Sequence, residues 1–578
     1  MSCLLANEVS YRETMNMHQP KIINKFSLVA FLLVTLFACN QPSPKPTQAN
    51  IAEVPNQVKA ENIKAHIEFL ADDSLQGRDT GSNGYQVAAN YVTSYFKQLG
   101  LTPQGTNIAS EHRGFEQQVR FRKSYLVDGS ASATIHGLKG DVELEYLSEF
   151  LTSGSNLRNQ SAITAATVFV GYGVISQEFG YNDYENIDVK GKIVVALTGR
   201  PEDLPSEEGA HIGSGAEKSR HAAEHGAIGF ITIHTPKREK VRSFEKSAQY
   251  ANTPRLSWLT KDNMPFGNQA EIIAGAYIAQ EAAKALFAGA ARTLEDIYTA
   301  DTNNNAIKGF ALPHKVTLKN RSRHEEITSP NVIAAVEGSD AELKNEYVVF
   351  SAHLDHIGIS SHGDDEDIIN NGALDNASGV AILLETARLL ADMEIKPKRS
   401  VLFVVVTGEE KGLLGSSYFA NNPTIPITQL VANVNLDMPL ILYPFADVIA
   451  FGSTHSTMGE IVAAAAKKID IELSEDPMPE QALFTRSDHY SFVKAGIPSV
   501  FLMTGFKSTD ESIDGGAVFG EFLKNHYHQH SDEITLPINY DAAANFALVN
   551  MMIGLEIANQ LERPKWHRGD FFGVTFAQ

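Results

Sequence analysis

Three apolar runs in the second half of the sequence are each followed at once by side chains that bind metal ions or move protons. Residues 347–352, 401–406 and 430–436 are near-continuous apolar stretches, as expected for strands buried on both faces. The polar side chains that follow these runs are His353, Asp355, Glu409, Glu410 and Asp437. Imidazoles and carboxylates are the usual protein ligands of zinc, and a carboxylate beside a metal site can act as a general base.

Two further segments supply candidates of the same kind. Asp375 lies in the glycine-flanked stretch 371–379, directly before a segment with apolar residues at helical spacing, and its carboxylate can use both oxygens. The polar segment 526–532 contains His528, with His526 and His530 two residues away on either side. In an extended loop all three histidines would point to one side, so spacing alone leaves the choice among them open.

The elements that must position these side chains follow from the alternation of strand-like and helical segments after residue 331. This βαβ pattern predicts a mostly parallel sheet covered by helices, an α/β fold. Ligands in such sheets bind beyond the carboxyl ends of the strands, where the candidates all fall. Taken singly, a Glu pair before a helix, an Asx cap or a lone histidine is usually structural. Their joint placement at one sheet edge favours a metal site.

The first half of the chain has a different organisation. Residues 62–101 predict two amphipathic helices, joined by a turn at 77–81 and ended by Gly100. From about residue 115 short alternating segments predict β-structure. Between 165 and 300 we expect strands at 167–170, 192–197 and 229–233 and a helix at 218–225, and this region offers no cluster of metal ligands.

Composition excludes several classes of protein. Over 578 residues, 43% are hydrophobic and 20% charged, which is ordinary globular usage. The net charge of −21 would repel a nucleic-acid backbone, so we expect no nucleic-acid binding. Both cysteines, Cys3 and Cys39, lie near the N-terminus, so the rest of the chain can form neither a disulfide nor a thiolate metal site.

The N-terminus predicts export. Lys21 and Lys25 precede the apolar run 26–38, which suits a signal h-region and is short for a membrane span. The run ends in Leu-Phe-Ala-Cys, which resembles a bacterial lipobox, so we expect a lipoprotein-type signal peptide over 1–38 and a lipid anchor at Cys39; the alternative is plain signal-peptidase cleavage nearby. The predicted location is the bacterial cell envelope, in the periplasm or at the outer membrane. Residues 39–55 predict a linker.

Five stretches resemble the metal-site motifs of the M28 family of zinc exopeptidases. They are 353–355 (HLD), 372–379 (GALDNASG), 408–416 (GEEKGLLGS), 435–438 (NLDM) and Tyr527-His528. Residues 70–81, 329–332 and 486–489 are also similar to that family. Residues 186–194 and 222–231 resemble a protease-associated (PA) domain, a common insertion in it. The resemblance implies a three-layer αβα peptidase domain with a mostly parallel central sheet, in two parts over 56–150 and 311–565, with a β-rich PA domain at 151–310 and a C-terminal tail at 566–578.

The resemblance also implies a ligand set for two Zn²⁺ ions. Asp375 would bridge the ions, His353 and Asp437 would complete the ligands of one ion, and Glu410 and His528 those of the other. His528 is chosen over its neighbours on the family's Tyr-His pattern. Three carboxylates give −3 against +4 for two ions, and a bridging hydroxide brings the centre to zero, which favours two ions over one.

Three further residues receive catalytic roles. By resemblance Glu409 is the general base and then the acid, and Tyr527 could donate its hydroxyl to the tetrahedral intermediate. Asp355 lies two residues from His353 on the same face of an extended chain, so we expect its side chain to hold the imidazole.

The expected function is an exported dinuclear zinc aminopeptidase that removes N-terminal residues from peptides through a metal-bridging hydroxide and a Glu base. A carboxypeptidase or dipeptidase with the same two-zinc site is the alternative, and a non-catalytic PA-domain receptor or scaffold is a third reading. Peptides are the expected partners, with membrane contact only through Cys39. Oligomeric state and side-chain preference are left open.

Overall fold

The computed structural model describes residues 57–106, 113–137, 140–360 and 367–577. The predicted signal peptide (1–38) and the whole of the predicted linker (39–55), including Cys39, lie outside the described residues. The two helices predicted over 62–101 are present as α1 (Ala60–Leu70) and α2 (Asn83–Gln98). Ser82 caps α2 by accepting a hydrogen bond from the Tyr85 N–H, and Gly100 follows the helix with a φ of 70°.

A mixed sheet with a parallel centre forms the middle layer of the larger region. Its strands run in the order β2, β13, β17, β14, β18, β21, β19, β20. Their bounds are β2 (Glu116–Leu126), β13 (Phe310–Val336), β14 (Tyr347–His353), β17 (Ser400–Val406), β18 (Leu430–Asn435), β19 (Asp447–Phe451), β20 (Glu472–Ser474) and β21 (Ser499–Thr504), with the short β1 (Thr102–Pro103) paired to β13. β14 pairs in parallel with both β17 and β18, which places their carboxyl ends at one edge. The α/β architecture expected from the sequence is confirmed.

Helices cover both faces of this sheet. Alternate residues of β17 point to opposite sides: Val401, Phe403 and Val405 belong to one hydrophobic cluster, and Leu402, Val404 and Val406 to another. The helices are α9 (Gly379–Asp392), α10 (Leu414–Asn421), α11 (Met458–Lys467), α12 (His489–Lys494), α13 (Gly515–Asn525), α14 (Tyr540–Asn559) and α15 (Phe571–Phe576). The first cluster joins the sheet to α1, α2, α9, α11, α13 and α14, and the second joins it to α10 and α12. Within the described residues α14 alone has the length and composition of a membrane span, but its best 18-residue window is 78% buried and packs in the core.

The insert forms a second sheet with its own core. Its strands are β3 (Ser132–Gly137), β4 (Gly140–Leu144), β5 (Phe150–Leu151), β6 (Gln160–Phe169), β9 (Ile193–Leu197), β10 (Gly229–Ile233) and β12 (Ala274–Ile278), while β11 (Arg255–Trp258) pairs with β2. Two-residue strands β7 (Ile175–Ser176) and β8 (Tyr181–Asn182) form a separate pair. Its helices are α3 (Ser206–Ile212), α4 (Gly215–Glu224), α5 (Pro236–Val241), α6 (Phe244–Ala248), α7 (Gln280–Phe287) and α8 (Leu294–Thr302). β3 and β4 pair within this sheet, so the border predicted at residue 151 separates strands that belong together.

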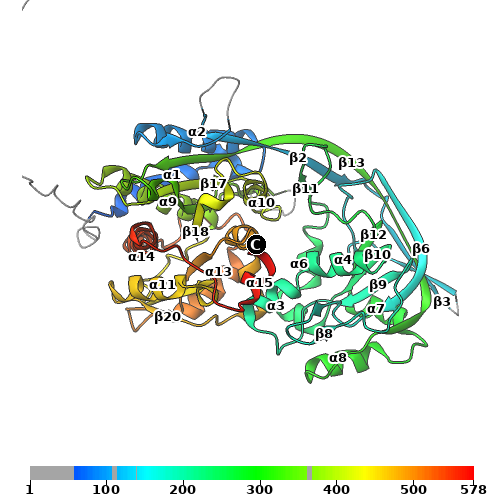
Figure 1. Cartoon of the computed structure of the whole chain (residues 1–578). Coiled ribbons are helices and arrows are strands. Elements are labelled where there is room, and N and C mark those ends of the chain that lie inside the picture. The colour runs from blue at the N-terminus through cyan, green and yellow to red at the C-terminus, as the bar shows by residue number, and fades with distance from the viewer. Residues whose placement is uncertain (1–56, 107–112, 138–139, 361–366, 578) are drawn as a thin grey trace, which may run out of the picture. The chain divides into compact units, whose positions relative to one another are not determined.

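One long strand belongs to both sheets. Residues 310–321 of β13 pair with β6, residues 322–332 with β2, and residues 332–336 with β17. Figure 1 shows β2 and β13 running together from the peptidase sheet towards the strands of the insert. The predicted domain border at 310/311 therefore falls at the start of a continuous strand.

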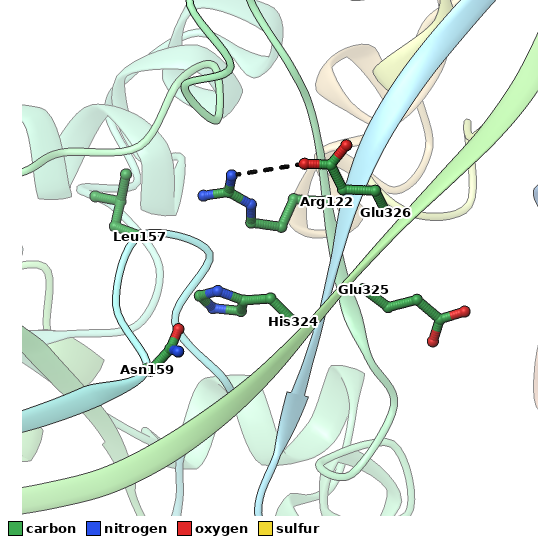
Figure 2. A pocket seen from close by; sticks show the side chains of 6 residues that line it. All are labelled: Arg122, Leu157, Asn159, His324, Glu325 and Glu326. Carbon is green, nitrogen blue, oxygen red and sulfur yellow. Dashed lines mark ion pairs between the residues drawn. The ribbon is translucent and has the colours of Figure 1, made fainter.

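The paired strands β2 and β13 are hydrogen-bonded to the loop before β6. Figure 2 shows Arg122 and His324 on the side of the ribbon that faces Leu157 and Asn159, with Glu325 on the other side. The His324 Nε2 donates to the main-chain oxygen of Ser155 at 2.7 Å, and Arg122 donates to that of Asn156 at 3.4 Å. These contacts enclose the shallow pocket drawn in the figure.

A buried histidine joins the insert to the peptidase region. His455 lies 2.7 Å from Glu207 of α3 through Nε2 and 2.5 Å from Asp570 through Nδ1. Burial alone would lower the pKa of His455, but the two carboxylates outweigh burial and raise it to about 10. The segment predicted as a C-terminal tail thus packs against the fold, and its Phe572 is fully buried.

We expect Glu207→Gln to lower the free energy of unfolding by about 1–3 kcal/mol at pH 6, because it removes one partner of a buried cation. Since the folded-state pKa of His455 is raised, the stabilisation is complete below its unfolded pKa of about 6.5 and is lost as pH rises to about 10. Thermal unfolding at a series of pH values measures this. Glu224→Gln, which removes an exposed ion pair with Arg220, is the control and should change little; equal effects of the two substitutions would contradict the prediction.

Candidate metal centre

The predicted ligands converge at the carboxyl edge of the parallel strands. His353 is the last residue of β14, Glu409 and Glu410 follow β17, and Asp437 follows β18. Asp375 lies in the irregular turn 373–378 before α9, and His528 lies in the loop after α13. The structure therefore brings all five residues of the predicted ligand set together with Glu409.

The first group of donor atoms surrounds His353. Its Nε2 lies 3.0 Å from Asp437 Oδ1 and 3.3 Å from Asp375 Oδ1. Ligand atoms of these three residues all lie within 4.8 Å of one another, and all three residues are buried. Burial alone would lower the pKa of His353, but Asp437 and Glu409 outweigh burial and hold it well above its usual value.

The second group lies on the other side of Asp375. His528 Nε2 is 3.3 Å from Asp375 Oδ2 and 3.1 Å from Glu410 Oε2. His526 Nδ1 lies 2.9 Å from Ser531 Oγ, so His528 is the histidine placed beside Asp375 and Glu410. The two oxygens of Asp375 thus face different histidines, the arrangement that a bridging carboxylate requires.

A histidine that sequence reasoning missed also belongs to the second group. His356 is fully buried, and its Nδ1 lies 2.6 Å from Glu410 Oε1 and 4.0 Å from Asp375 Oδ2. Asp355 was selected because residues two apart in an extended chain point to the same side. His356 lies three residues after His353, the last residue of β14, so this rule gave no reason to select it. The sequence signal was present as a second histidine in the His-Leu-Asp-His stretch 353–356.

Gly372 leaves the space for this imidazole. It has a φ of 58°, and a Cβ there would lie 2.7 Å from the His356 ring and 2.1 Å from the Asp375 carbonyl oxygen. Both the left-handed backbone and the close approach therefore require glycine at this position.

The role predicted for the Asp355 side chain is wrong in its details. The His353 Nδ1 donates to the main-chain oxygen of Asp355, at 3.0 Å, and not to its carboxylate. That carboxylate accepts hydrogen bonds from the main-chain N–H groups of Glu409 and Glu410, at 3.1 and 3.3 Å, and from Thr80 Oγ1. Asp355 therefore orients the imidazole through its backbone and the Glu-Glu turn through its side chain.

Two further buried residues that the sequence reasoning did not select fix the Asp375 loop. The Asp532 carboxylate accepts from the N–H of Leu374 at 2.9 Å and from that of Asp375 at 3.0 Å. Arg78 donates to the carbonyl oxygens of Asn371, at 2.7 Å, and Leu354, at 2.9 Å. The Arg78 guanidinium is fully buried, and carbonyl oxygens accept its hydrogen bonds. Its positive charge lies close enough to act on the carboxylates of the site, which in turn favour the charged guanidinium.

Glu409 lies beside the two groups, and with His353 and Glu410 it forms a third set of possible ligand atoms that all lie within 4.8 Å of one another. Its Oε2 lies 4.0 Å from His353 Nε2, and its side chain is 10% exposed. Burial raises the pKa of Glu409 well above its usual value, which suits a group that takes up and returns a proton near neutral pH. Burial also acts on Glu410, but His528 and His356 outweigh it and hold the pKa of Glu410 well below its usual value.

Tyr527 and Arg486 form one wall of the site. The Tyr527 ring stacks on the His528 ring with 3.9 Å between centroids, and its hydroxyl accepts from Arg486 at 3.1 Å. Burial raises the pKa of the Tyr527 hydroxyl, so it keeps its proton. Next to them lies a pocket shared by the metal-site residues and an apolar set comprising Met438, Leu483, Phe501, Met503 and Leu523.

The donor set fits zinc. Nitrogen and carboxylate donors are the ligands that zinc binds in the absence of cysteine, and each oxygen of Asp375 has its own partners. The hydrogen bond from His353 Nδ1 to a backbone carbonyl fixes the tautomer that leaves Nε2 free for a metal.

The fold and the site together define an α/β protein with a metal centre of histidines and carboxylates at the carboxyl edge of its sheet. Comparison with known protein families narrows the class of protein further. Residues 331–553 match the model described as peptidase family M28, and residues 163–286 match that of the PA domain. These two matches confirm the resemblance to M28 zinc exopeptidases with a PA domain that the sequence motifs indicated.

The similar proteins support this assignment at modest identity. The leupeptin-inactivating enzyme 1 of Streptomyces exfoliatus is 29% identical over 228 residues, which cover 38% of this chain and 47% of that protein. A probable leucine aminopeptidase 2 of Aspergillus fumigatus is 28% identical over 224 residues, 37% of this chain and 41% of that protein. This chain thus spans less than half the length of these curated relatives. The aminopeptidase of Aneurinibacillus sp. strain AM-1 has the same fold, with a TM-score of 0.51, 20% identity and coverage of 90% of this chain and 99% of that one.

Proposed function

We propose that this protein is a zinc-dependent aminopeptidase that removes N-terminal residues from peptides, with two ions held by the two groups of donors around Asp375. One observation carries the proposal: Asp375 presents one oxygen to His353 and the other to His528, with Glu409 beside them and an apolar pocket adjoining. The names of the similar proteins, which include leucine aminopeptidases, support the exopeptidase class. Export and anchoring at Cys39 are part of the proposal and depend on the sequence alone.

The residues of the site have distinct tasks. Zinc, when bound, supplies acidification of a water molecule and polarisation of the scissile carbonyl. Glu409 takes a proton from the attacking water and returns it to the leaving nitrogen. Tyr527, held by Arg486, presents a protonated hydroxyl to the oxygen that becomes negative. The pocket formed by Leu483, Phe501 and Met503 suits an apolar side chain next to the scissile bond.

The experiment that tests the function compares peptides with free and blocked N-termini, with and without a chelator. We expect hydrolysis only of the free peptides and only with metal. Hydrolysis of N-blocked peptides would favour the carboxypeptidase reading, and release of residues from dipeptides alone would favour the dipeptidase reading. If the zinc-loaded protein hydrolyses none of the peptides, the result would favour a non-catalytic receptor or scaffold.

His356 gives a prediction about the second ion. We expect His356→Ala to weaken the binding of one zinc ion about 10- to 100-fold, because Glu410 loses the imidazole that contacts it at 2.6 Å. Titration of the apoprotein with zinc against a competing chelator measures the change. His526→Ala, on the same side of the fold but bonded to Ser531, is the control and should bind zinc as the wild type does. Equal zinc affinities in both variants would exclude His356 from the centre.

A further inference from the structure

A row of cations in the insert has no acidic partner. Arg238 lies in α5, Arg242 directly follows that helix, Lys246 lies in α6, and Tyr250 follows α6, each four residues after the one before. All four are half-buried. Across the residues that the structure describes, none of the three cations lies within 4 Å of a carboxylate, although the sequence has 69 acidic residues against 48 basic ones.

Direct contacts join this row to the metal centre. The Arg242 guanidinium lies over the Tyr250 ring, 5.1 Å from its centroid, and the Tyr250 hydroxyl donates to the main-chain oxygen of His528 at 3.3 Å. On the other side of His528, Tyr527 stacks on the imidazole and accepts a hydrogen bond from Arg486. The insert therefore reaches the half of the site that His528 and Glu410 form.

The cations are close enough to repel one another. Burial lowers the pKa of Arg238; Tyr277 beside it acts in the opposite direction, and the guanidinium groups of Arg486 and Arg242 add to the lowering. Burial likewise lowers the pKa of Lys246, with Arg242 adding to the effect. Half-buried like charges without counter-ions destabilise a fold, and such local conflicts are typical of sites that bind a ligand of opposite charge.

The position of the row limits which anion can bind. The apolar pocket is lined by His353 and Asp437 and also by Tyr527 and Arg486, whereas neither Tyr250 nor the cations of the row line it. If a peptide places its first side chain in that pocket, the contact between Tyr250 and His528 puts the row beside the portion of the peptide that follows the scissile bond. The anion nearest to the row is then a carboxylate on the leaving side of the scissile bond.

We infer that Arg238 and Arg242 bind a substrate carboxylate on the leaving side of the scissile bond, an assignment that rests on the proposed aminopeptidase function. Guanidinium groups match carboxylates with paired hydrogen bonds, which ammonium groups do not provide. Two kinds of peptide present such a group: dipeptides with a free C-terminus, and longer peptides with an acidic residue second in sequence. The PA domain would then select substrates directly.

The test uses two pairs of peptides that differ only in that charge. Leu-Gly is compared with Leu-Gly amide, and Leu-Glu amide with Leu-Gln amide, by kcat/KM on the zinc-loaded full chain. In the wild type we expect the charged member of at least one pair to be preferred about tenfold. In the double variant Arg238→Gln/Arg242→Gln that ratio should fall close to one, whereas Lys240→Gln, an exposed cation of the same helix, should retain it. The pair that shows the preference identifies the source of the carboxylate.

Each other outcome rejects the assignment. No preference in the wild type, or a preference that the double variant retains, would exclude a carboxylate site at the row while leaving aminopeptidase activity intact. Zinc content and thermal unfolding of each variant confirm that the folded metal centre is compared. Failure of the wild type to cleave any of the four peptides would instead remove the proposed function itself.

Discussion

Glu409→Gln should abolish turnover and leave bound zinc nearly unchanged. Glutamine keeps the shape of the side chain but cannot accept the proton of the attacking water, so kcat should fall at least about 10³-fold. The reason lies in the placement of Glu409, whose Oε2 is 4.0 Å from His353 Nε2, farther than the atoms of Asp375 and Asp437. Steady-state kinetics and metal content measured by mass spectrometry on the same preparation check both parts of the prediction.

Glu410→Gln is the matched comparison, since it changes the neighbouring residue in the same way. Glu410 Oε2 is 3.1 Å from His528 Nε2, and we expect this variant to lose metal. Loss of zinc from Glu409→Gln together with its retention in Glu410→Gln would mean that the roles of base and ligand are exchanged.

Asp375→Ala should release both zinc ions together. Asp375 is the only residue in contact distance of both His353 and His528 among the described donors, through different oxygens. Removing it leaves each ion one ligand short and leaves Asp437 and Glu410 less well compensated. We expect zinc to fall from about two ions per chain to near zero after dialysis, with loss of activity.

Asp437→Ala provides the contrast, because Asp437 lies 3.0 Å from His353 and belongs to the first group of donors. This variant should weaken the binding of one zinc ion more than that of the other. If Asp375→Ala also retains one tightly bound ion, the bridging role is wrong and the centre holds its ions independently.

The site residues that could be predicted from the sequence are those that lie at the ends of strands. His353, Glu410 and Asp437 follow buried runs whose parallel pairing can be read from the βαβ pattern, so their common edge follows from topology. The predicted helices over 62–101 and the strands of the insert were found for the same reason, a strong local pattern. His528 depended on the family's motif, since it lies in a loop with no periodic signal.

Residues that act through long-range contacts could not be predicted in this way. Asp532 and Arg78 hold the Asp375 loop from positions more than 150 residues away from it, and only the folded chain brings them there. His356 lies just past the point where strand alternation ends, so its direction was not determined by spacing. The Asp355 side chain differed from expectation because the strand turns after His353 and sends that carboxylate towards the Glu-Glu turn.

The shared strand β13 limits how the PA domain can move. A lid that swings on a flexible linker can open without disturbing the body beneath it, but here 310–336 is one uninterrupted strand, hydrogen-bonded to the insert at one end and to β17 at the other. Any tilt of the insert must bend or twist β13 and its partner β2, and the strain passes to β17, the strand that Glu409 and Glu410 follow. The two regions should accordingly melt in a single cooperative step, and neither should fold alone when the chain is cut within that strand.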